Sequence, residues 1–283
     1  MEISPAPAPP ALDLPLQQHP SFARMLGPRC TSYGIYDQGS AVGHVQLIRR
    51  GRLWLASRGP VWLDPGAQTA GMRALRRHLP GWSGLVINAE TPVKDGWQAG
   101  FVRLSTGLTV AEWQLGAVAQ VRAALHPKWR NRLVRAENAG LRVIQSTLPA
   151  DPAHWLLAND GTQQRAKGYR AWPASLCAAY ARANPDQAQL WTADRGDGPL
   201  AAVLVLIHGT VASYQIGWSG AAGRAAHAHN LLLWRAACWL ADQGVRRFDL
   251  GSVDSKSTPG LAHFKLGTGA AMRTLGGTWA TLC

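Results

Sequence analysis

Residues 229–243 read HNLLLWRAACWLADQ, and they predict a helix that is apolar on almost every face. A helix that is hydrophobic all round is buried inside its domain. Gly244 follows at the position where a left-handed residue commonly ends a helix. The start of the helix therefore points its free backbone N–H groups into the preceding turn. Because that end carries a partial positive charge, it suits a phosphate or another anion.

The chain on either side of this helix predicts the elements that enclose it. Residues 189–193, 200–207 and 211–217 predict three antiparallel strands, which lead into a turn rich in glycine and alanine. Residues 245–250 predict a further strand, and a loop then closes on AHFKLG at residues 262–267. This order of strands, helix and strand predicts a mixed α/β layer around the buried helix.

The N-terminal half has the same order of elements. Residues 42–49 and 52–55 predict a strand pair, residues 66–79 a helix, and residues 84–88 a short apolar strand. Both halves therefore consist of strands, a helix and a strand, which predicts a duplicated unit. The fold class that follows is α/β (α+β), with a mixed, mostly antiparallel sheet flanked by helices in each half.

Composition predicts where the chain divides. Prolines crowd the first of four segments, residues 1–30, which predicts an extended N-terminal arm. Residues 31–110 form the first predicted domain, residues 111–150 predict linking helices, and residues 151–283 form the second domain. The prolines of the arm are Pro5, Pro7, Pro9, Pro10, Pro15 and Pro20.

The chain is strongly basic. Its net charge is +13, with 29 lysines and arginines against 16 acids. A basic chain favours anionic partners such as nucleic acid, phosphates or a membrane surface. A GC-rich genome, which supplies arginine freely, explains the same composition, and because the charge is spread along the chain both explanations stay open. The apolar content of 47% is enough for a sizeable core and argues against wholesale disorder.

Several classes of protein are disfavoured. The sequence lacks the glycine loop of P-loop NTPases and the dinucleotide fingerprint. GWSGA at residues 217–221 has alanine where a nucleophile elbow needs its last glycine, and His227 and His229 lack a nearby third metal ligand. With no leader and no apolar run longer than residues 200–207, we expect a cytoplasmic protein without a transmembrane segment. Four widely spaced cysteines predict reduced structural thiols: Cys30, Cys177, Cys238 and Cys283.

Residues 127–139 predict a helix with one basic face. Lys128, Arg132 and Arg135 recur at helical spacing and share that face. Such a face is either a solvated surface or a contact for phosphate or RNA. Together with Arg130, these residues are the candidates for binding an anionic substrate.

The turn before the buried helix holds a second candidate anion site. Arg224, His227 and His229 bring a cation and two imidazoles to the free N–H groups of the helix start, which continues with Asn230 and Leu231. Small alanines around them leave room for a ligand to approach the backbone. A phosphate site and an ordinary capped helix are equally compatible with this pattern.

Lysine is rare in this chain, and Lys265 has an apolar setting that includes Phe264. A partly buried ammonium can stabilise an oxyanion that forms during acyl transfer. A lysine whose head reaches solvent past an apolar stem has the same sequence pattern. The residues alone leave both alternatives open.

Four segments carry a resemblance to a known family. They are a histidine (His227 or His229) followed by NLLLWRA at residues 230–236, GxxxFDLG at residues 244–251, GLAxFKxGxG at residues 260–269, and HPKWRNRLVRAENAG at residues 126–140. Their order resembles the C-terminal half of Fem-type aminoacyltransferases, and it is equally similar to related GNAT-like acyltransferases. The resemblance covers residues 105–283 and implies two tandem GNAT-like domains.

The resemblance also implies the transfer of an acyl group to an amine. Lys265 is then expected to stabilise the tetrahedral oxyanion, and Phe264 to form a wall of the acyl channel. The candidates for a general base, by position only, are His229, Asp249 and His263. The residues expected to hold the phosphate of the donor are Arg224, His227, His229, Asn230 and Leu231.

The implied co-substrate is acyl-CoA or aminoacyl-tRNA, with no permanently bound cofactor. The implied acceptor is a small-molecule or cell-wall-precursor amine, and tRNA is a further expected partner. One departure concerns the usual phosphate turn, Gln/Arg-x-x-Gly-x-Gly/Ala: here Arg224 keeps the first position, and His227 and His229 replace the small residues. The alternative is a non-catalytic GNAT-like protein that binds RNA or an anionic polymer through Arg122, Lys128, Arg130, Arg132 and Arg135.

Overall fold

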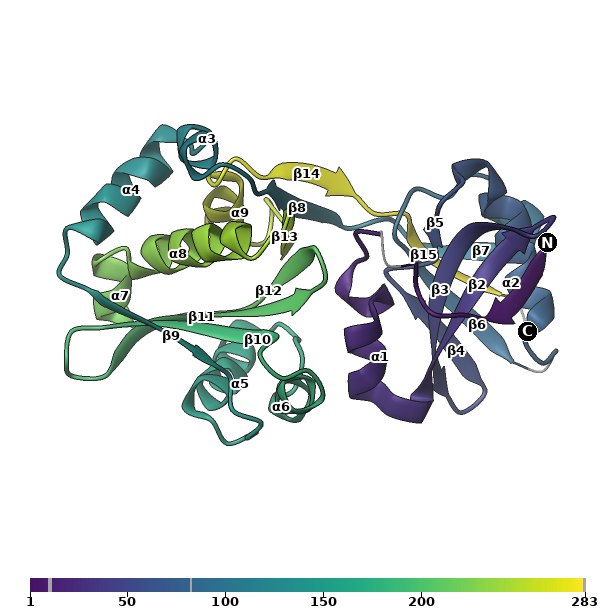
Figure 1. Ribbon diagram of the computed structural model, residues 1–283, viewed down its shortest axis with the longest axis horizontal. Helices are drawn as coiled ribbons and strands as arrows, with labels where there is room; N and C mark the ends of the chain where they lie inside the picture. Colours follow the sequence, from purple (N-terminus) through teal and green to yellow (C-terminus); the bar gives the residue numbers. More distant parts are fainter. Residues whose placement is uncertain (10–11, 82, 282–283) are drawn as a thin grey trace. The chain divides into compact units, whose positions relative to one another are not determined.

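The computed structural model describes residues 1–9, 12–81 and 83–281, so Pro10 and Cys283 lie outside the described residues. The chain divides into two compact units. The first consists of Met1–Val110 together with Arg273–Cys283, and the second of Ala111–Met272 (Figure 1). Each unit is built on its own mixed sheet, as the fold class predicted.

The sheet of the first unit has the order β1-β2-β3-β4-β6-β15-β7, and β5 also pairs with β3. Its neighbours are antiparallel except for the parallel pair β4–β6. The strands are β1 (Glu2–Pro5), β2 (Cys30–Asp37), β3 (Ser40–Arg50), β4 (Leu53–Ser57), β5 (Val61–Trp62), β6 (Gly84–Ala89), β7 (Phe101–Ser105) and β15 (Gly277–Thr281). The helices are α1 (Pro20–Leu26) and α2 (Gln68–His78), with short 3-10 turns at Leu16–Gln18, Gly27–Arg29, Pro65–Ala67 and Gly96–Ala99.

The core of the first unit packs α2 against this sheet. Leu85 and Ile87 of β6 are buried two positions apart, which fits a strand with one fully covered face, whereas residues 42–48 of β3 are all buried, so both faces of that strand are covered. Leu75 of α2 belongs to the same buried cluster. The strand pair, helix and strand predicted in this half therefore exist as β3, β4, α2 and β6.

The proline-rich N-terminus is folded. Glu2–Pro5 forms β1, which pairs with β2 along its whole length. The side chains of Leu16 and Phe22 are buried. This differs from the extended arm predicted over residues 1–30, because pairing with β2 satisfies the backbone of the strand and apolar residues between the prolines reach the core.

The C-terminal strand also belongs to the first unit. β15 pairs antiparallel with β6 on one side and with β7 on the other. The second unit therefore ends at Met272, whereas the sequence predicted a second domain over residues 151–283. It also begins earlier, at Ala111, and includes residues 111–150. This stretch was predicted as linking helices, and it contains helices at Val118–Ala123 and Pro127–Glu137 but strands at Thr109–Gln114 and Arg142–Thr147.

The sheet of the second unit has the order β14-β8-β13-β12-β11-β10-β9. Figure 1 shows α8 on one face of this sheet and α5 and α6 on the other. The strands are β8 (Thr109–Gln114), β9 (Arg142–Thr147), β10 (Ala188–Asp194), β11 (Pro199–His208), β12 (Val211–Ser219), β13 (Arg247–Ser252) and β14 (Ala271–Thr274). The helices are α3 (Val118–Ala123), α4 (Pro127–Glu137), α5 (Trp155–Lys167), α6 (Ala174–Ala183), α7 (Ala221–Ala225), α8 (Ala228–Asp242) and α9 (Pro259–Leu266).

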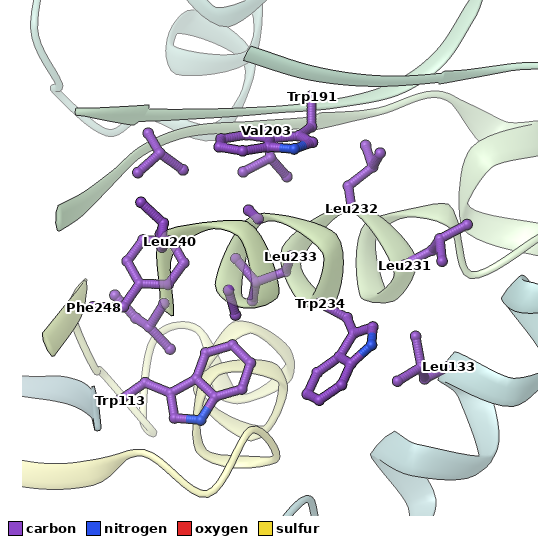
Figure 2. Close-up of a cluster of buried hydrophobic side chains, with 14 of the residues drawn as sticks. Trp113, Leu133, Trp191, Val203, Leu231, Leu232, Leu233, Trp234, Leu240 and Phe248 are labelled. Atoms are coloured by element: carbon purple, nitrogen blue, oxygen red, sulfur yellow. The ribbon is translucent and has the colours of Figure 1, made fainter. Parts of the chain in front are cut away.

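Helix α8 is buried, as its all-round apolar sequence predicted. Leu232 is fully buried and lies on the side of the helix that faces Trp191 and Val203 of the sheet (Figure 2). Trp234 lies on the opposite side, where its ring centroid is 6.5 Å from that of Trp113. The helix therefore makes apolar contacts on both sides and has a fixed place in the unit.

The end of α8 also follows the prediction. Gly244 has φ of +79°, a conformation that favours glycine. Its N–H donates to the carbonyl of Ala241, and the N–H of Val245 donates to the carbonyl of Leu240 at 2.9 Å. These bonds satisfy carbonyls at the C-terminal end and set the direction of the chain into β13.

Truncation of Leu232 should destabilise the protein strongly. Leu232→Ala leaves a cavity between α8 and the sheet, and such changes cost about 2–5 kcal/mol of unfolding free energy. Chemical denaturation measures this difference, with Met272→Ala as a control because Met272 is largely exposed. A loss below about 1 kcal/mol would mean that α8 is not packed as described.

Candidate active site

The candidate site begins where β12 and β13 separate. The two strands run parallel and pair at only three positions, from Val211 opposite Arg247 to Ser213 opposite Asp249. Beyond that point β12 has a bulge, because Tyr214 and Ile216 face consecutive residues of β11. A bulge bends its strand and increases the local twist. The sheet therefore opens between the far halves of β12 and β13.

A tyrosine–histidine pair lies at this opening. The hydroxyl of Tyr214 is 2.8 Å from Nε2 of His229, which belongs to the first turn of α8. Gly217 makes room for the pair, since a Cβ there would lie 1.7 Å from the Tyr214 hydroxyl oxygen. The sequence analysis selected His229 but missed Tyr214, whose only signal was its place in a predicted strand just before a glycine.

The surroundings fix the protonation of this pair. Burial lowers the pKa of His229 to about 4, so the imidazole is neutral at pH 7. The backbone of Trp218 forms a hydrogen bond with the ring and opposes that shift. A backbone carbonyl that accepts a hydrogen bond from Nδ1–H has this effect on the pKa. Nε2 then accepts from the Tyr214 hydroxyl, whose own pKa burial raises. This makes His229 a weak general base, because its acceptor nitrogen is already occupied.

Lys265 of α9 is buried, with 6% of its surface exposed. Its Nζ donates to the carbonyl of Ser252, at the end of β13, over 2.7 Å. Burial lowers the pKa of this ammonium to about 8, and the nearby charge of Asp249 opposes that shift. The alternative of a lysine head that reaches solvent is therefore wrong, and the ammonium lies at the end of the strand that borders the opening.

The two other candidate bases are held by local hydrogen bonds. The Asp249 carboxylate is buried and accepts the N–H of Gly251 at 2.7 Å. The exposed ring of His263 uses Nδ1 in a 2.8 Å contact with the carbonyl of Pro259, one turn earlier in α9. Asp249 lies near the ammonium of Lys265, and its charge raises the pKa of that group. His263 instead faces solvent.

Phe264 connects α9 with the start of α8. Its ring centroid is 5.2 Å from that of His229 and 6.0 Å from that of Trp129 in α4. The structure therefore brings the predicted Phe264 and His229 together.

The start of α8 differs from the predicted phosphate turn. His227 caps the helix with φ of +50°, and its carbonyl accepts the N–H of Asn230 at 3.0 Å. Arg224 donates to the carbonyl of Ser219 at 2.5 Å. Leu231 is part of the core. Of the five residues expected to hold a phosphate, four are thus engaged in the fold in these ways, and His229 is paired as described above.

The basic face of α4 lies near that helix start. Trp129 packs into the core, while Lys128, Arg132 and Arg135 are exposed on the other side of α4, and Arg130 is partly exposed. Burial, followed by the charges of Arg132 and Arg135, lowers the pKa of His227. These two arginines therefore place positive charge beside the first turn of α8, where His227 is held in its neutral form.

A cavity of about 430 Å³ lies between α4 and α9. Its lining includes Lys128, Trp129 and Arg132 from α4 and His263 from α9. The indole nitrogen of Trp129 is buried and has no hydrogen-bond partner among the described residues. Basic groups thus surround a largely apolar space next to Phe264.

The family can now be assigned. Residues 122–266 match the acetyltransferase (GNAT) domain family. The chain belongs to this family. It is therefore a GNAT-type N-acyltransferase, as the resemblance implied. No curated protein matches the sequence of this acyltransferase at a significant level.

Solved structures share the fold of this GNAT acyltransferase. FemX superposes with a TM-score of 0.74 at 14% identity, over 95% of this chain and 92% of that one. A conserved protein of unknown function from Bacteroides thetaiotaomicron gives 0.60 at 13% identity, over 98% and 93%. The C-terminal domain of a putative lysylphosphatidylglycerol synthetase from Agrobacterium fabrum gives 0.53 at 13% identity, over 84% and 80%. The predicted tandem, Fem-type arrangement is confirmed at the level of the fold.

Two further findings concern metal ligands and the length of the helices. Across the described ranges, no three histidine, cysteine or acidic side chains are grouped as a metal site would need. None of the helices described in the structure has the length and apolarity needed to cross a bilayer.

Removal of the His229 ring should make the acyltransferase less sensitive to acid. The folded pKa of His229 is about 4 against an ordinary 6.5, so the unfolded chain binds the proton more readily. Its contribution to stability is complete above pH 6.5 and is lost as the pH falls towards 4, up to about 3 kcal/mol. In His229→Gln, the loss of unfolding free energy between these pH values should be smaller by that amount.

Chemical denaturation at several pH values measures the difference between wild type and variant. His263→Gln controls for the change of residue type, because His263 is exposed. Equal acid sensitivity of wild type and His229→Gln would show that His229 is not held neutral in the fold.

Proposed function

We propose that the protein transfers an acyl group from acyl-CoA to an amine, with the ammonium of Lys265 as the stabiliser of the oxyanion. The observation that carries this proposal is the placement of a buried cation at the end of β13, beside the opening in the sheet. Within the described residues, one of the three N–H groups of Nζ is used, by the carbonyl of Ser252. Two N–H groups therefore stay available for a carbonyl oxygen of the substrate.

Besides this donor to the oxyanion, acyl transfer requires few other groups from the protein. The nitrogen of a neutral amine attacks the thioester carbonyl, a C–N bond forms, and the C–S bond breaks as the intermediate collapses. The proton of the amine leaves with the thiolate, which departs as a thiol. A fixed donor aimed at the developing oxyanion contributes about 3 kcal/mol to the transition state. Phe264 and the neutral His229–Tyr214 pair exclude water from this region.

Two features support an anionic donor such as acyl-CoA. GNAT acetyltransferases use acyl-CoA as their co-substrate. The cavity between α4 and α9 combines an apolar lining with Lys128 and Arg132, and it borders Phe264 through Trp129. Arg135 extends the positive charge towards His227 and the start of α8. Aminoacyl-tRNA is the alternative donor, and a small-molecule or cell-wall-precursor amine is the proposed acceptor.

The alternative function, a non-catalytic RNA-binding protein, relied on five basic residues, and one of them is engaged within the fold. Arg122 makes a two-pronged ion pair with Glu137 at 2.8 Å and lies over the ring of Trp234. It therefore stabilises the packing of α3 and α4. The remaining basic residues of α4 serve the phosphates of a donor equally well.

Replacement of Lys265 should abolish turnover without unfolding the protein. Lys265→Met keeps an apolar stem in the buried position and removes the cation. Loss of one oxyanion donor lowers kcat by about 100-fold or more. The release of free thiol from acyl-CoA in the presence of an amine measures the rate, and thermal unfolding verifies the fold.

Lys256→Met is the matched control, since Lys256 is an exposed lysine in the loop before α9. Turnover near the wild-type rate in a folded Lys265→Met enzyme would rule out the proposed role. Loss of folding in that variant would make Lys265 a structural residue.

The proposed role also predicts a pH dependence. Because the pKa of Lys265 is about 8, the ammonium is present below that pH and is lost above it. An arginine keeps its charge throughout this range. With saturating amine, the ratio of wild-type kcat to that of Lys265→Arg should fall about tenfold per pH unit above 8. A ratio that does not change with pH would exclude the ammonium as the active form.

A further inference from the structure

A second cavity lies on the other face of the sheet from α8. It has a volume of about 770 Å³ and is lined by α5, by the loop that follows it and by the start of α6. This volume falls in the range of small-molecule sites. Its polar and aromatic lining includes Asp160, Gln164, Arg165, Tyr169, Arg170 and Trp172.

Asp160 is the unusual member of this lining. The residue is 5% exposed. Its carboxylate accepts hydrogen bonds from Nε2 of Gln164 at 2.7 Å and from the hydroxyl of Tyr169 at 3.3 Å. Both donors are neutral. In the part of the chain that the structure describes, Asp160 forms no ion pair. A buried carboxylate is costly unless a cation balances it, so this one is suited to a cationic ligand.

The mouth of the cavity has the opposite charge. Arg165 and Arg170 line it and are exposed. Guanidinium groups bind carboxylates and phosphates well. The rings of Tyr169 and Trp172 add faces on which an ammonium is stabilised. A negative group inside and positive groups at the rim together suit a ligand that has one ammonium and one anionic group.

A chain of hydrogen bonds connects this cavity with the opening in the sheet. Nε2 of Gln163 donates to the Tyr169 hydroxyl at 2.9 Å and to the carbonyl of Gly217 at 3.3 Å. Gly217 is the residue that makes room for the Tyr214–His229 pair. The polar groups around Asp160 therefore reach the strand that borders the candidate active site.

We propose that this cavity recognises the acceptor through a zwitterionic part separate from the reacting amine, with an ammonium at Asp160 and a carboxylate or phosphate at Arg165 and Arg170. The role as acceptor rests on the function proposed above, whereas the binding itself does not. Asp160 is a recognition residue here, and no bond is made or broken at its carboxylate.

Calorimetric titration without an acyl donor tests the binding. The probes are L-phenylalanine, which offers a carboxylate and a ring for the aromatic lining, and phosphoethanolamine, which offers a phosphate. N-acetyl-L-phenylalanine lacks the ammonium and 2-phenylethylamine lacks the anion. At least one zwitterion should bind, and the matching compound without an ammonium should not.

The decisive variant is Asp160→Asn, which keeps the shape and an oxygen acceptor. Loss of the charge-assisted contact should weaken binding about ten- to hundredfold. Asp151→Asn is the control, since it removes the same charge at an exposed residue. Thermal unfolding confirms that each variant is folded, and a fall in affinity should then occur for Asp160→Asn alone.

The outcomes separate this proposal from the proposed function. It is overturned if neither zwitterion binds the wild type, or if Asp160→Asn binds as tightly as the wild type. Binding of a zwitterion with no consumption of acyl-CoA would support the cavity and defeat the acyl transfer. Acyl transfer to an amine with an unchanged KM in Asp160→Asn would defeat the cavity alone.

Discussion

The short parallel contact between β12 and β13 determines where the sheet of the second unit opens. Three residue pairs join the strands, and the bulge after Ser213 turns β12 away. A wider contact would close the sheet and leave no opening for a carbonyl. Because α8 follows β12 and precedes β13, its burial on both sides keeps the strands in place while they diverge. The opening is therefore a consequence of how the core packs, and Tyr214 and His229 pair beside it only because Gly217 has no side chain.

Two charged side chains of this unit, Lys265 and Asp160, are buried, whereas the core of a protein is usually apolar. The charge of Lys265 is partly balanced by the carbonyl of Ser252 and by the nearby charge of Asp249. The carboxylate of Asp160 accepts hydrogen bonds from two neutral donors. A core optimised for stability alone would replace such groups with apolar residues. The lowered pKa of Lys265 agrees with the tendency of perturbed charges to occur at functional sites.

The sequence could predict what depends on local pattern. The burial of α8, the left-handed Gly244 and the basic face of α4 all follow from spacing and residue type, and each exists in the structure. Long-range pairing could not be predicted in this way. β15 joins β6 and β7 from almost 200 residues away, and β1 pairs with β2 in spite of its proline. Tyr214 was missed for the same reason, since its importance comes from a contact with His229 that no local pattern indicates.

The cations of the site differ in a way that suits separate tasks. Arg132 and Arg135 keep their charge at every accessible pH, so the surface beside α8 attracts anions under all conditions. Lys265 is buried, and its pKa near 8 means that little free energy separates its charged and neutral forms at neutral pH. A poorly hydrated ammonium of this kind exchanges its weak protein contacts for an oxyanion at small cost. An arginine at position 265 would instead be a permanent cation, because its guanidinium keeps its charge. Lysine at this one position therefore couples the charge of the buried group to pH.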